Sequence, residues 1–174
     1  MTNHHGRARR LGDNINTDYI IASTRKKESL DEHILKRYLL EAVDPGFAAS
    51  VRTGDILVAG ANFGCGSAME VAATVILAAG IPVVLARSFA RSFYRNAINN
   101  GLLAIECDTG DLLEGDAVSL SIDASGTTIT NERTGRRETH PPLGGIAGAI
   151  LAARGLVPYL KREGRFAPAA PSPE

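Results

Sequence analysis

A short apolar run that ends in a glycine-rich loop constrains the fold of this chain more than any other feature. The run "DILVAG", residues 55–60, has the composition of a buried strand, and the loop "GANFGCGSAME" continues from it. Apolar residues at helical spacing then predict a helix over 67–79. Because the loop joins a strand to a helix, we expect it at the carboxyl edge of a sheet, where open α/β folds bind ligands.

The same alternation of strand and helix continues along the chain. The pattern predicts a strand over 82–87, a helix over 88–101 and a strand over 102–107. Strands separated by helices at this spacing are joined by right-handed parallel crossovers. The middle of the chain therefore predicts an α/β fold with a small parallel sheet.

The two ends of the chain carry other patterns. In chain order they predict strands over 7–12 and 19–23, a helix over 30–42 opened by a capping box of Ser29 and Glu32, a turn at 44–46, an antiparallel hairpin of strands over 117–123 and 127–132, and a helix over 144–155. The proline- and alanine-rich tail 164–174 is predicted to be disordered. Residues 1–163 are therefore expected to form one domain.

Length, charge and cysteine content narrow the functional classes. The 174 residues suffice for one domain with a core, and a formal net charge of zero argues against a nucleic-acid partner. No apolar run reaches ~18 residues and no secretion signal is recognisable, so we expect no membrane contact and a cytoplasmic location. The two cysteines, Cys65 and Cys107, cannot supply a zinc site or an iron–sulfur cluster by themselves. His4 and His5 are interpreted as part of a mobile terminus rather than as metal ligands.

The glycine loop indicates an anion site. Free N–H groups and the positive end of the following helix favour a negative ligand. A nucleotide P-loop is excluded because no lysine follows the glycines, and Gly64 and Gly66 lack the third glycine of a dinucleotide fingerprint. Two simpler interpretations stay open, namely a tight turn in which Ser67 only caps the helix, and a redox role for Cys65 near a helix N-terminus.

Four sequence blocks in a fixed order are similar to those of a known family. They are "GDNINTDYII", "GANFGCGSAME", "ARSFARSFYRNAINNGLLAIE" and "ILAARGLVPYLKR", and they span about Leu11 to Lys161. The chain resembles the small subunits of 3-isopropylmalate dehydratase, in the superfamily that includes aconitase and homoaconitase. The resemblance implies a three-layer β/β/α swivel domain, with added antiparallel strands beside the parallel sheet.

The same resemblance implies an activity and a partner. The reaction would be the reversible dehydration and hydration of a substituted malate or a related hydroxy-polycarboxylate, as in leucine biosynthesis. A separate large subunit would hold a [4Fe–4S] cluster whose iron polarises the departing hydroxyl as a Lewis acid. This chain would then bind no metal of its own, and its remaining partner would be the small hydroxy-acid substrate.

The resemblance also assigns roles to individual residues. Ser67, the serine after G-x-G, corresponds to the base that removes the carbon-bound proton, and loop N–H groups would stabilise its alkoxide. Thr17 and Asp18 match a second active-site pair. The full expected substrate-binding set is Thr17, Asp18, Arg25, Asn62, Gly64, Cys65, Gly66, Ala68 and Met69.

Two positions depart from the family pattern. Ala68 and Met69 stand where the family has serine and arginine, so a two-pronged cation for a substrate carboxylate is missing. We expect either an uncharged substrate group near Met69, with poor turnover of 3-isopropylmalate, or a substitute cation from the loop that holds Arg25, Lys26 and Lys27. That basic run is equally well explained as solvated surface.

Two alternatives stay open beside this hypothesis. One is a hydro-lyase small subunit for a different substrate, of the homoaconitate or 2,3-dimethylmalate type. The other is a non-catalytic paralogue that regulates or scaffolds a large subunit. Retention of Ser67, Thr17 and Asp18 favours an enzyme, whereas loss of the arginine favours the paralogue.

Overall fold

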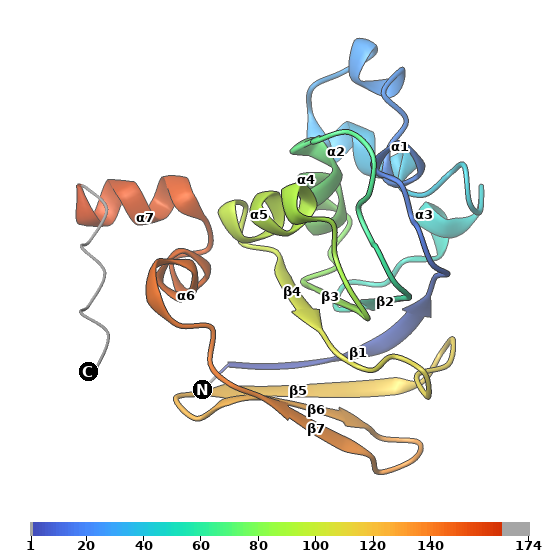
Figure 1. The fold of residues 1–174 in the computed structure, drawn as a ribbon. Coiled ribbons are helices and arrows are strands. Elements are labelled where there is room, and N and C mark those ends of the chain that lie inside the picture. The colour runs from blue at the N-terminus through green and yellow to red at the C-terminus, as the bar shows by residue number, and fades with distance from the viewer. Residues whose placement is uncertain (1, 165–174) are drawn as a thin grey trace.

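The computed structural model describes residues 2–164, in which seven strands form one strongly curled mixed sheet (Figure 1). The strand order is β4-β3-β2-β1-β5-β6-β7. The strands are β1 (Thr2–Arg10), β2 (Ile56–Ala59), β3 (Val83–Ala86), β4 (Leu103–Glu106), β5 (Ala117–Asp123), β6 (Gly126–Asn131) and β7 (Arg137–His140).

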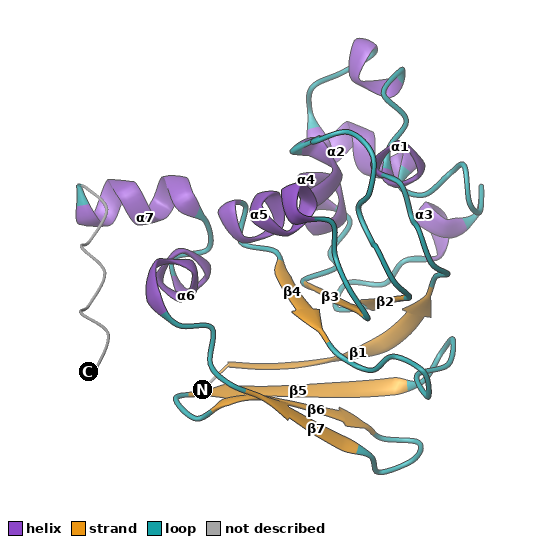
Figure 2. Ribbon diagram, in the orientation of Figure 1, coloured by secondary structure: helices purple, strands orange, loops and turns teal. Residues whose placement is uncertain are grey.

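The helices are short and lie mostly over the parallel half of the sheet (Figure 2). They are α1 (Thr17–Ile20), α2 (Glu32–Leu35), α3 (Phe47–Ser50), α4 (Val71–Ala78), α5 (Arg91–Asn99), α6 (Gly145–Ala152) and α7 (Leu156–Glu163), with 3-10 turns η1 (Arg25–Lys27) and η2 (Lys36–Tyr38). No helix among residues 2–164 is both long and apolar enough to cross a membrane.

Strand β1 joins the two halves of the sheet. Its carboxyl end pairs in parallel with β2, through Ala8 opposite Ile56, while its amino-terminal part pairs antiparallel with β5, through His4 opposite Leu120. Strands β2, β3 and β4 continue the parallel half, and β5, β6 and β7 form the antiparallel half. The N-terminus is therefore a paired strand, and the expectation of a mobile segment at His4 and His5 is wrong.

The parallel half is buried on both faces, which makes the fold three-layered. One face packs against α1–α5 through residues such as Leu57, Val84 and Phe93. The other packs against the antiparallel half through Ile56, Leu85 and their neighbours. This arrangement confirms the predicted β/β/α fold, and it explains why β2 and β3 are continuous apolar runs.

The middle of the chain follows the prediction, with later helix starts. The strands over 55–60, 82–87 and 102–107 are present as β2, β3 and β4, and the hairpin is present as β5 and β6. Helix α4 begins at Val71 rather than at residue 67. Strand β7 was not predicted, because its sequence "RETH" lacks the apolar residues that mark a strand.

The first third departs most from the prediction. Segment 19–23 is not a strand, since Asn16 caps the helical turn α1. The predicted capping box does not form either, because Asp31 is the N-cap and accepts a hydrogen bond from the backbone of His33. Helix α2 is a single turn, and Leu30, which the predicted helix over 30–42 included, is 84% exposed.

The C-terminal region forms two helices instead of one. Arg154 and Gly155 adopt positive φ angles of 63° and 126°, which end α6 and turn the chain into α7. The predicted disordered tail falls almost entirely on residues 165–174, which lie outside the described residues, so that expectation stays a prediction.

Candidate active site

The loops that follow β1 and β2 run side by side beyond the ends of the strands. Gly60 N–H donates to the carbonyl of Gly12 at 3.0 Å, and Gly64 N–H donates to the carbonyl of Ile15 at 2.8 Å. Thr17 N–H then donates to the carbonyl of Cys65 at 2.8 Å. The parallel pairing of β1 and β2 therefore continues through both loops and brings the two sequence blocks together at the carboxyl edge.

Asp13 and Ser88 anchor the start of the glycine loop. Asp13 Oδ1 accepts a hydrogen bond from the backbone of Ala61 at 2.8 Å and forms an ion pair with Arg87. The Ala61 N–H and the Arg87 guanidinium hold the pKa of Asp13 below its usual value. From the loop after β3, Ser88 Oγ accepts from the backbone of Asn62 at 2.8 Å. Asp13 and Ser88 were not singled out from the sequence, although both lie within the quoted blocks.

Two glycines of the loop are required by close contacts. Gly64 and Gly66 have φ angles of 77° and 91°. A Cβ on Gly64 would lie 2.2 Å from the Phe93 ring, and one on Gly66 would lie 2.4 Å from Asn16 Oδ1. The loop can therefore approach α5 and α1 only with glycine at both positions. Asn62 also has a positive φ, of 59°, and its side chain donates to Asn14 Oδ1 at 3.0 Å.

Ser67 lies at the exposed end of this loop. Its carbonyl accepts a hydrogen bond from Thr17 Oγ1 at 2.9 Å. The N-cap of α4 is Glu70, so Ser67 precedes the helix and the expectation that it stands at or near the cap is wrong. The backbone N–H groups of Gly66, Ser67 and Ala68 have no acceptor among residues 2–164. Their free donors can bind an anion beside the Ser67 hydroxyl.

Thr17 and Asp18 lie at the same edge but face different ways. Thr17 is 1% exposed, and its hydroxyl donates a hydrogen bond to the Ser67 carbonyl, so it is not available to a ligand. Asp18 is half-buried, and its Oδ1 accepts from the backbone of Ser23 at 3.1 Å. Asn16 Oδ1 accepts from the backbone of Asp18 at 2.9 Å and so fixes this turn. Asp18 keeps Oδ2 without a hydrogen bond to any described residue, whereas Thr17 has the geometry of a positioning residue.

The remaining loop residues divide between surface and core. Ala68 and Gly66 are exposed and Cys65 is half-buried. Met69, however, is 7% exposed and packs in the core between the helices and the parallel sheet. The structure therefore does not place the Met69 side chain where the missing arginine was expected to meet a substrate.

Arg25 is committed to partners of its own. Its Nε and Nη2 donate to the two carboxylate oxygens of Glu41 at 2.8 and 3.0 Å, and Nη1 donates to Glu28 at 3.0 Å. The guanidinium also lies 3.9 Å from the centre of the Tyr38 ring. The hydrogen bonds that Arg25 donates to Glu41 and Glu28 raise its pKa, although partial burial acts in the opposite direction. In this arrangement Arg25 clamps loop 22–30 onto η2 instead of offering a free fork to a ligand.

The described residues do not fit an iron–sulfur cluster. Within 2–164, no group of three or more His, Cys, Asp or Glu side chains is placed to hold a metal ion. Burial and, to a smaller extent, the charge of Glu138 together raise the pKa of the Cys107 thiol to about 12, so this cysteine is a poor thiolate ligand. A cavity of about 410 Å³ lies beside β4, but it is not lined by Ser67.

Comparisons with known proteins agree with the fold. Residues 3–110 match the aconitase C-terminal domain family. The chain belongs to this family, whose fold is the curled mixed sheet described above.

Within the family, the chain is similar to small subunits of dehydratases. It is 47% identical over 161 residues to the 3-isopropylmalate dehydratase small subunit of Desulfovibrio desulfuricans, covering 91% of this chain and 96% of that protein. It is 43% identical over 158 residues to the methanogen homoaconitase small subunit of Methanocaldococcus jannaschii, covering 90% and 91%. A crystal structure of 3-isopropylmalate dehydratase (leuD) from Methanocaldococcus jannaschii superposes with a TM-score of 0.87 at 39% identity, covering 94% of this chain and 96% of that one.

Proposed function

We propose that this chain is the small subunit of a hydro-lyase of the 3-isopropylmalate dehydratase type, and that it supplies the catalytic base, Ser67. The nearly full-length similarity to such small subunits supports the class. The observation that carries the residue assignment is the exposed Ser67 hydroxyl beside the free N–H groups of Gly66, Ser67 and Ala68.

These backbone N–H groups can do two things that the reaction requires. A serine hydroxyl is too weak an acid to act as a base unless its alkoxide is stabilised, and preorganised N–H groups provide that stabilisation. The same donors can hold a substrate carboxylate, which positions the carbon-bound proton close to Oγ. Asp18 would face the substrate from the neighbouring loop with its Oδ2, which is unpaired among residues 2–164. Thr17 would hold Ser67 in position through the hydrogen bond to its carbonyl.

The iron–sulfur cluster is assigned to a partner. The name of the similar subunits implies a large subunit, and the described residues of this chain offer no suitable set of ligands. The steps proposed for this chain itself are substrate binding and proton removal at Ser67. The cytoplasmic location likewise remains a prediction.

The first candidate substrate is 3-isopropylmalate. Most of the similar proteins named above are 3-isopropylmalate dehydratases, and the homoaconitase relative makes homocitrate the second candidate. The absence of an arginine at position 69 still leaves one substrate carboxylate without the expected cation. The burial of Met69 shows only that the methionine side chain does not line the exposed loop surface, so the expectation of poor turnover of 3-isopropylmalate stays a prediction for the same assay.

The test is co-expression with a large subunit encoded in the same genome, anaerobic reconstitution, and assay of both substrates with wild type and Ser67→Ala. We expect turnover of 3-isopropylmalate, and a loss of about 10²–10⁴-fold in kcat for Ser67→Ala with little change in KM. Ser92→Ala, at a half-buried serine of α5, is the matched control. Near wild-type turnover by Ser67→Ala would contradict the assignment of the base, and failure to assemble with any large subunit would contradict the proposed function.

A further inference from the structure

The side-chain amide of Asn16 lies against the glycine loop, at the edge that carries Ser67. A Cβ built on Gly66 would lie 2.4 Å from Asn16 Oδ1 and 2.6 Å from Asn16 Nδ2, so the end of the carboxamide fills the space beside Gly66. Asn16 also forms a parallel β-bridge with Cys65. The amide therefore borders the loop N–H groups that are proposed to bind the substrate.

The orientation of this amide is fixed by the hydrogen bond of its oxygen. Asn16 Oδ1 accepts from the backbone N–H of Asp18 at 2.9 Å, and because an N–H can only donate, the atom that meets it is the oxygen. Asn16 Nδ2 donates to no residue within 2–164. The fully buried side-chain polar atom that lacks a partner in this range is His140 Nε2, so Asn16 Nδ2 reaches the surface. The edge thus presents a side-chain donor with a defined orientation.

The cations near this edge are either paired or not connected to the loop. Arg25 and Arg87 are held in ion pairs, and methionine stands where the family has arginine. Among the described residues, no hydrogen bond or ion pair joins Lys26, Lys27 or Arg91 to the glycine loop. A carboxylate at this edge therefore depends on uncharged donors.

We propose that Asn16 is a substrate-binding residue, whose Nδ2 donates a hydrogen bond to the carboxylate held by the backbone N–H groups of Gly66, Ser67 and Ala68. Side-chain amides and successive backbone N–H groups both bind anions without carrying a charge. In this role Asn16 holds the Asp18 turn with its oxygen and the substrate with its nitrogen. The inference rests on the proposed function, because it takes the hydroxy-acid substrate and the Ser67 edge as given.

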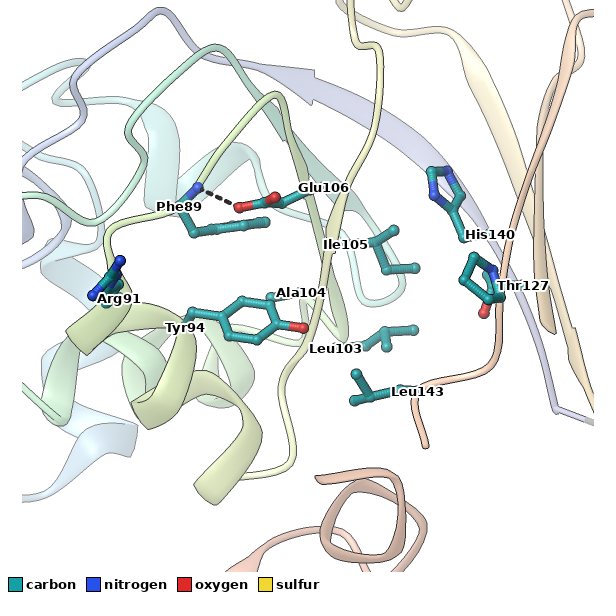
Figure 3. Close-up of a pocket in the computed structure, with 11 residues that line it drawn as sticks. Phe89, Arg91, Tyr94, Leu103, Ala104, Ile105, Glu106, Thr127, His140 and Leu143 are labelled. Carbon is teal, nitrogen blue, oxygen red and sulfur yellow. Dashed lines mark hydrogen bonds between the residues drawn. The ribbon is translucent and has the colours of Figure 1, made fainter. Parts of the chain in front are cut away.

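The cavity of about 410 Å³ beside β4 does not compete for this substrate (Figure 3). Its lining is mostly apolar, with side chains such as Leu103 and Ile105, and the charge of Arg91 is offset by that of Glu106. The lining includes no residue of the glycine loop. The edge with its row of N–H donors suits a ligand with two carboxylates better.

Asn16→Asp separates the two ends of the side chain. An aspartate keeps the oxygen that accepts from Asp18 and caps α1 as well as asparagine does, but it replaces the donor by a negative charge. Because Asp18 already places a carboxylate at this edge, the second charge would also repel the substrate. In the complex with the large subunit, we expect KM for 3-isopropylmalate to rise about 100-fold, with kcat within about threefold of wild type.

Two further variants separate loss of the donor from addition of a charge. Asn16→Ser keeps a capping oxygen, adds no charge and is too short to place a donor where Nδ2 lies, so KM is expected to rise about tenfold. Asn14→Asp is the matched charge control, at an exposed residue whose Oδ1 accepts from Asn62 Nδ2 at 3.0 Å and can keep that bond. It is expected to leave KM within about threefold of wild type. An equal rise in KM for Asn14→Asp and Asn16→Asp, or a wild-type KM for Asn16→Ser, would overturn the inference.

Equilibrium binding and unfolding give readouts that do not depend on turnover. Calorimetric titration of the assembled complex with isopropylsuccinate, which has both carboxylates of 3-isopropylmalate but lacks its hydroxyl, should rank the Kd values of the variants in the same order. In urea, the isolated Asn16→Asp chain should unfold at the same midpoint as wild type. A loss confined to stability would indicate a cap alone, and a loss confined to kcat would indicate contact with the Ser67 alkoxide. Either result would overturn the inference.

The same measurements separate failure of the inference from failure of the proposed function. If Ser67→Ala is inactive and both Asn16 variants turn over 3-isopropylmalate with the wild-type KM, only the inference is overturned. If the wild-type complex turns over neither candidate substrate, the proposed function is contradicted and the inference falls with it.

Discussion

The hydroxyl of Thr17 donates a hydrogen bond to the carbonyl of Ser67, the residue proposed as the base. The 2.9 Å hydrogen bond is made by a side chain that is 1% exposed, so under the proposed function Thr17 would act on the reaction through the position of Ser67. A small displacement of a reacting group lowers the rate strongly while affecting binding much less. The family resemblance implies an active-site role for Thr17, and its hydrogen bond to the Ser67 carbonyl is the basis for proposing it as a positioning residue.

Thr17→Val keeps the shape of the side chain and removes the donor. We predict a fall of about 10–100-fold in kcat for the assembled enzyme, with KM changed little. Thr17→Ser restores a hydroxyl at the same place and should recover most of the rate. Equal losses in both variants, or a loss confined to KM, would indicate a purely structural role or a direct substrate contact.

Met69 provides a stability test at the residue scale. Because its side chain is 7% exposed and packs in the core, Met69→Arg would bury a charge without a partner. We predict a loss of about 2–4 kcal/mol in the free energy of unfolding for Met69→Arg, and less than about 1.5 kcal/mol for the volume-conserving Met69→Leu. Urea unfolding of the isolated chain measures both. Wild-type stability of Met69→Arg, together with a higher kcat/KM, would mean that this position does reach the substrate.

The glycine loop is the element that sets the position of the site. Gly64 combines a φ of 77° with a hypothetical Cβ only 2.2 Å from Phe93, whereas Gly115 has a φ of 85° and open space around it. Comparison of the two separates backbone strain from steric conflict. Phe93 lies in the first turns of α5, so a displaced loop would move against that helix.

We predict that Gly115→Ala costs about 1 kcal/mol of stability and leaves activity intact, because only the left-handed backbone is strained. Gly64→Ala carries the same strain and a clash in addition, so it should lower both the melting temperature and kcat, the latter by about 10²-fold or more. Melting curves and steady-state kinetics report the two effects. If Gly64→Ala behaves like Gly115→Ala, the loop is free to move away from α5 without consequence.

Strands and helices with a clear pattern of apolar residues were predictable from the sequence, whereas single helical turns were not. Strands β2 and β3 are buried on both faces and read as apolar runs, so their sequence determines them locally. In segment 19–42, by contrast, Asn16 and Asp31 supply caps that override the apolar spacing. A single turn has no period to detect, and the identity of its cap depends on tertiary contacts.

The candidate site was predictable as a set of blocks but not as a set of contacts. The motifs placed Ser67, Thr17 and Asp18 together, and the paired loops agree with that. The burial of Met69 and the ion pair of Arg25 with Glu41 could not be predicted. Both depend on how separate segments of the chain pack together, which no local pattern encodes, whereas the Arg25–Glu28 pair is only three residues apart.

At the scale of the whole molecule, a buried charge network lies where the two halves of the sheet meet. Arg7 and Arg9 of β1 form ion pairs with Asp55, next to β2, and Arg9 also pairs with Glu114 before β5. The Arg9 guanidinium lies 4.4 Å from the centre of the Phe47 ring. The network therefore links β1 to neighbours on both sides, including the segment that leads into the antiparallel half.

Asp55 is the centre of this network, with a side chain 3% exposed. Burial alone would raise its pKa, but hydrogen bonds from Arg7 and from the backbone of Arg52, with the nearby positive charges, hold the pKa below the usual 3.8. A carboxylate with a lowered pKa stabilises the fold above its unfolded-state pKa. That stabilisation is lost as the pH falls through the lowered value.

We predict that Asp55→Asn lowers the free energy of unfolding by about 3 kcal/mol at pH 7, because it leaves two arginines facing a neutral group in a buried place. The difference between wild type and variant should stay constant down to about pH 5 and shrink below pH 4 as Asp55 becomes protonated in the wild type. Urea unfolding at a series of pH values measures it. Asp108→Asn, which breaks the exposed pair with Arg136, is the control and should change stability far less. A difference that is absent at pH 7, or that grows in acid, would show that the Asp55 pairs do not hold the two halves together.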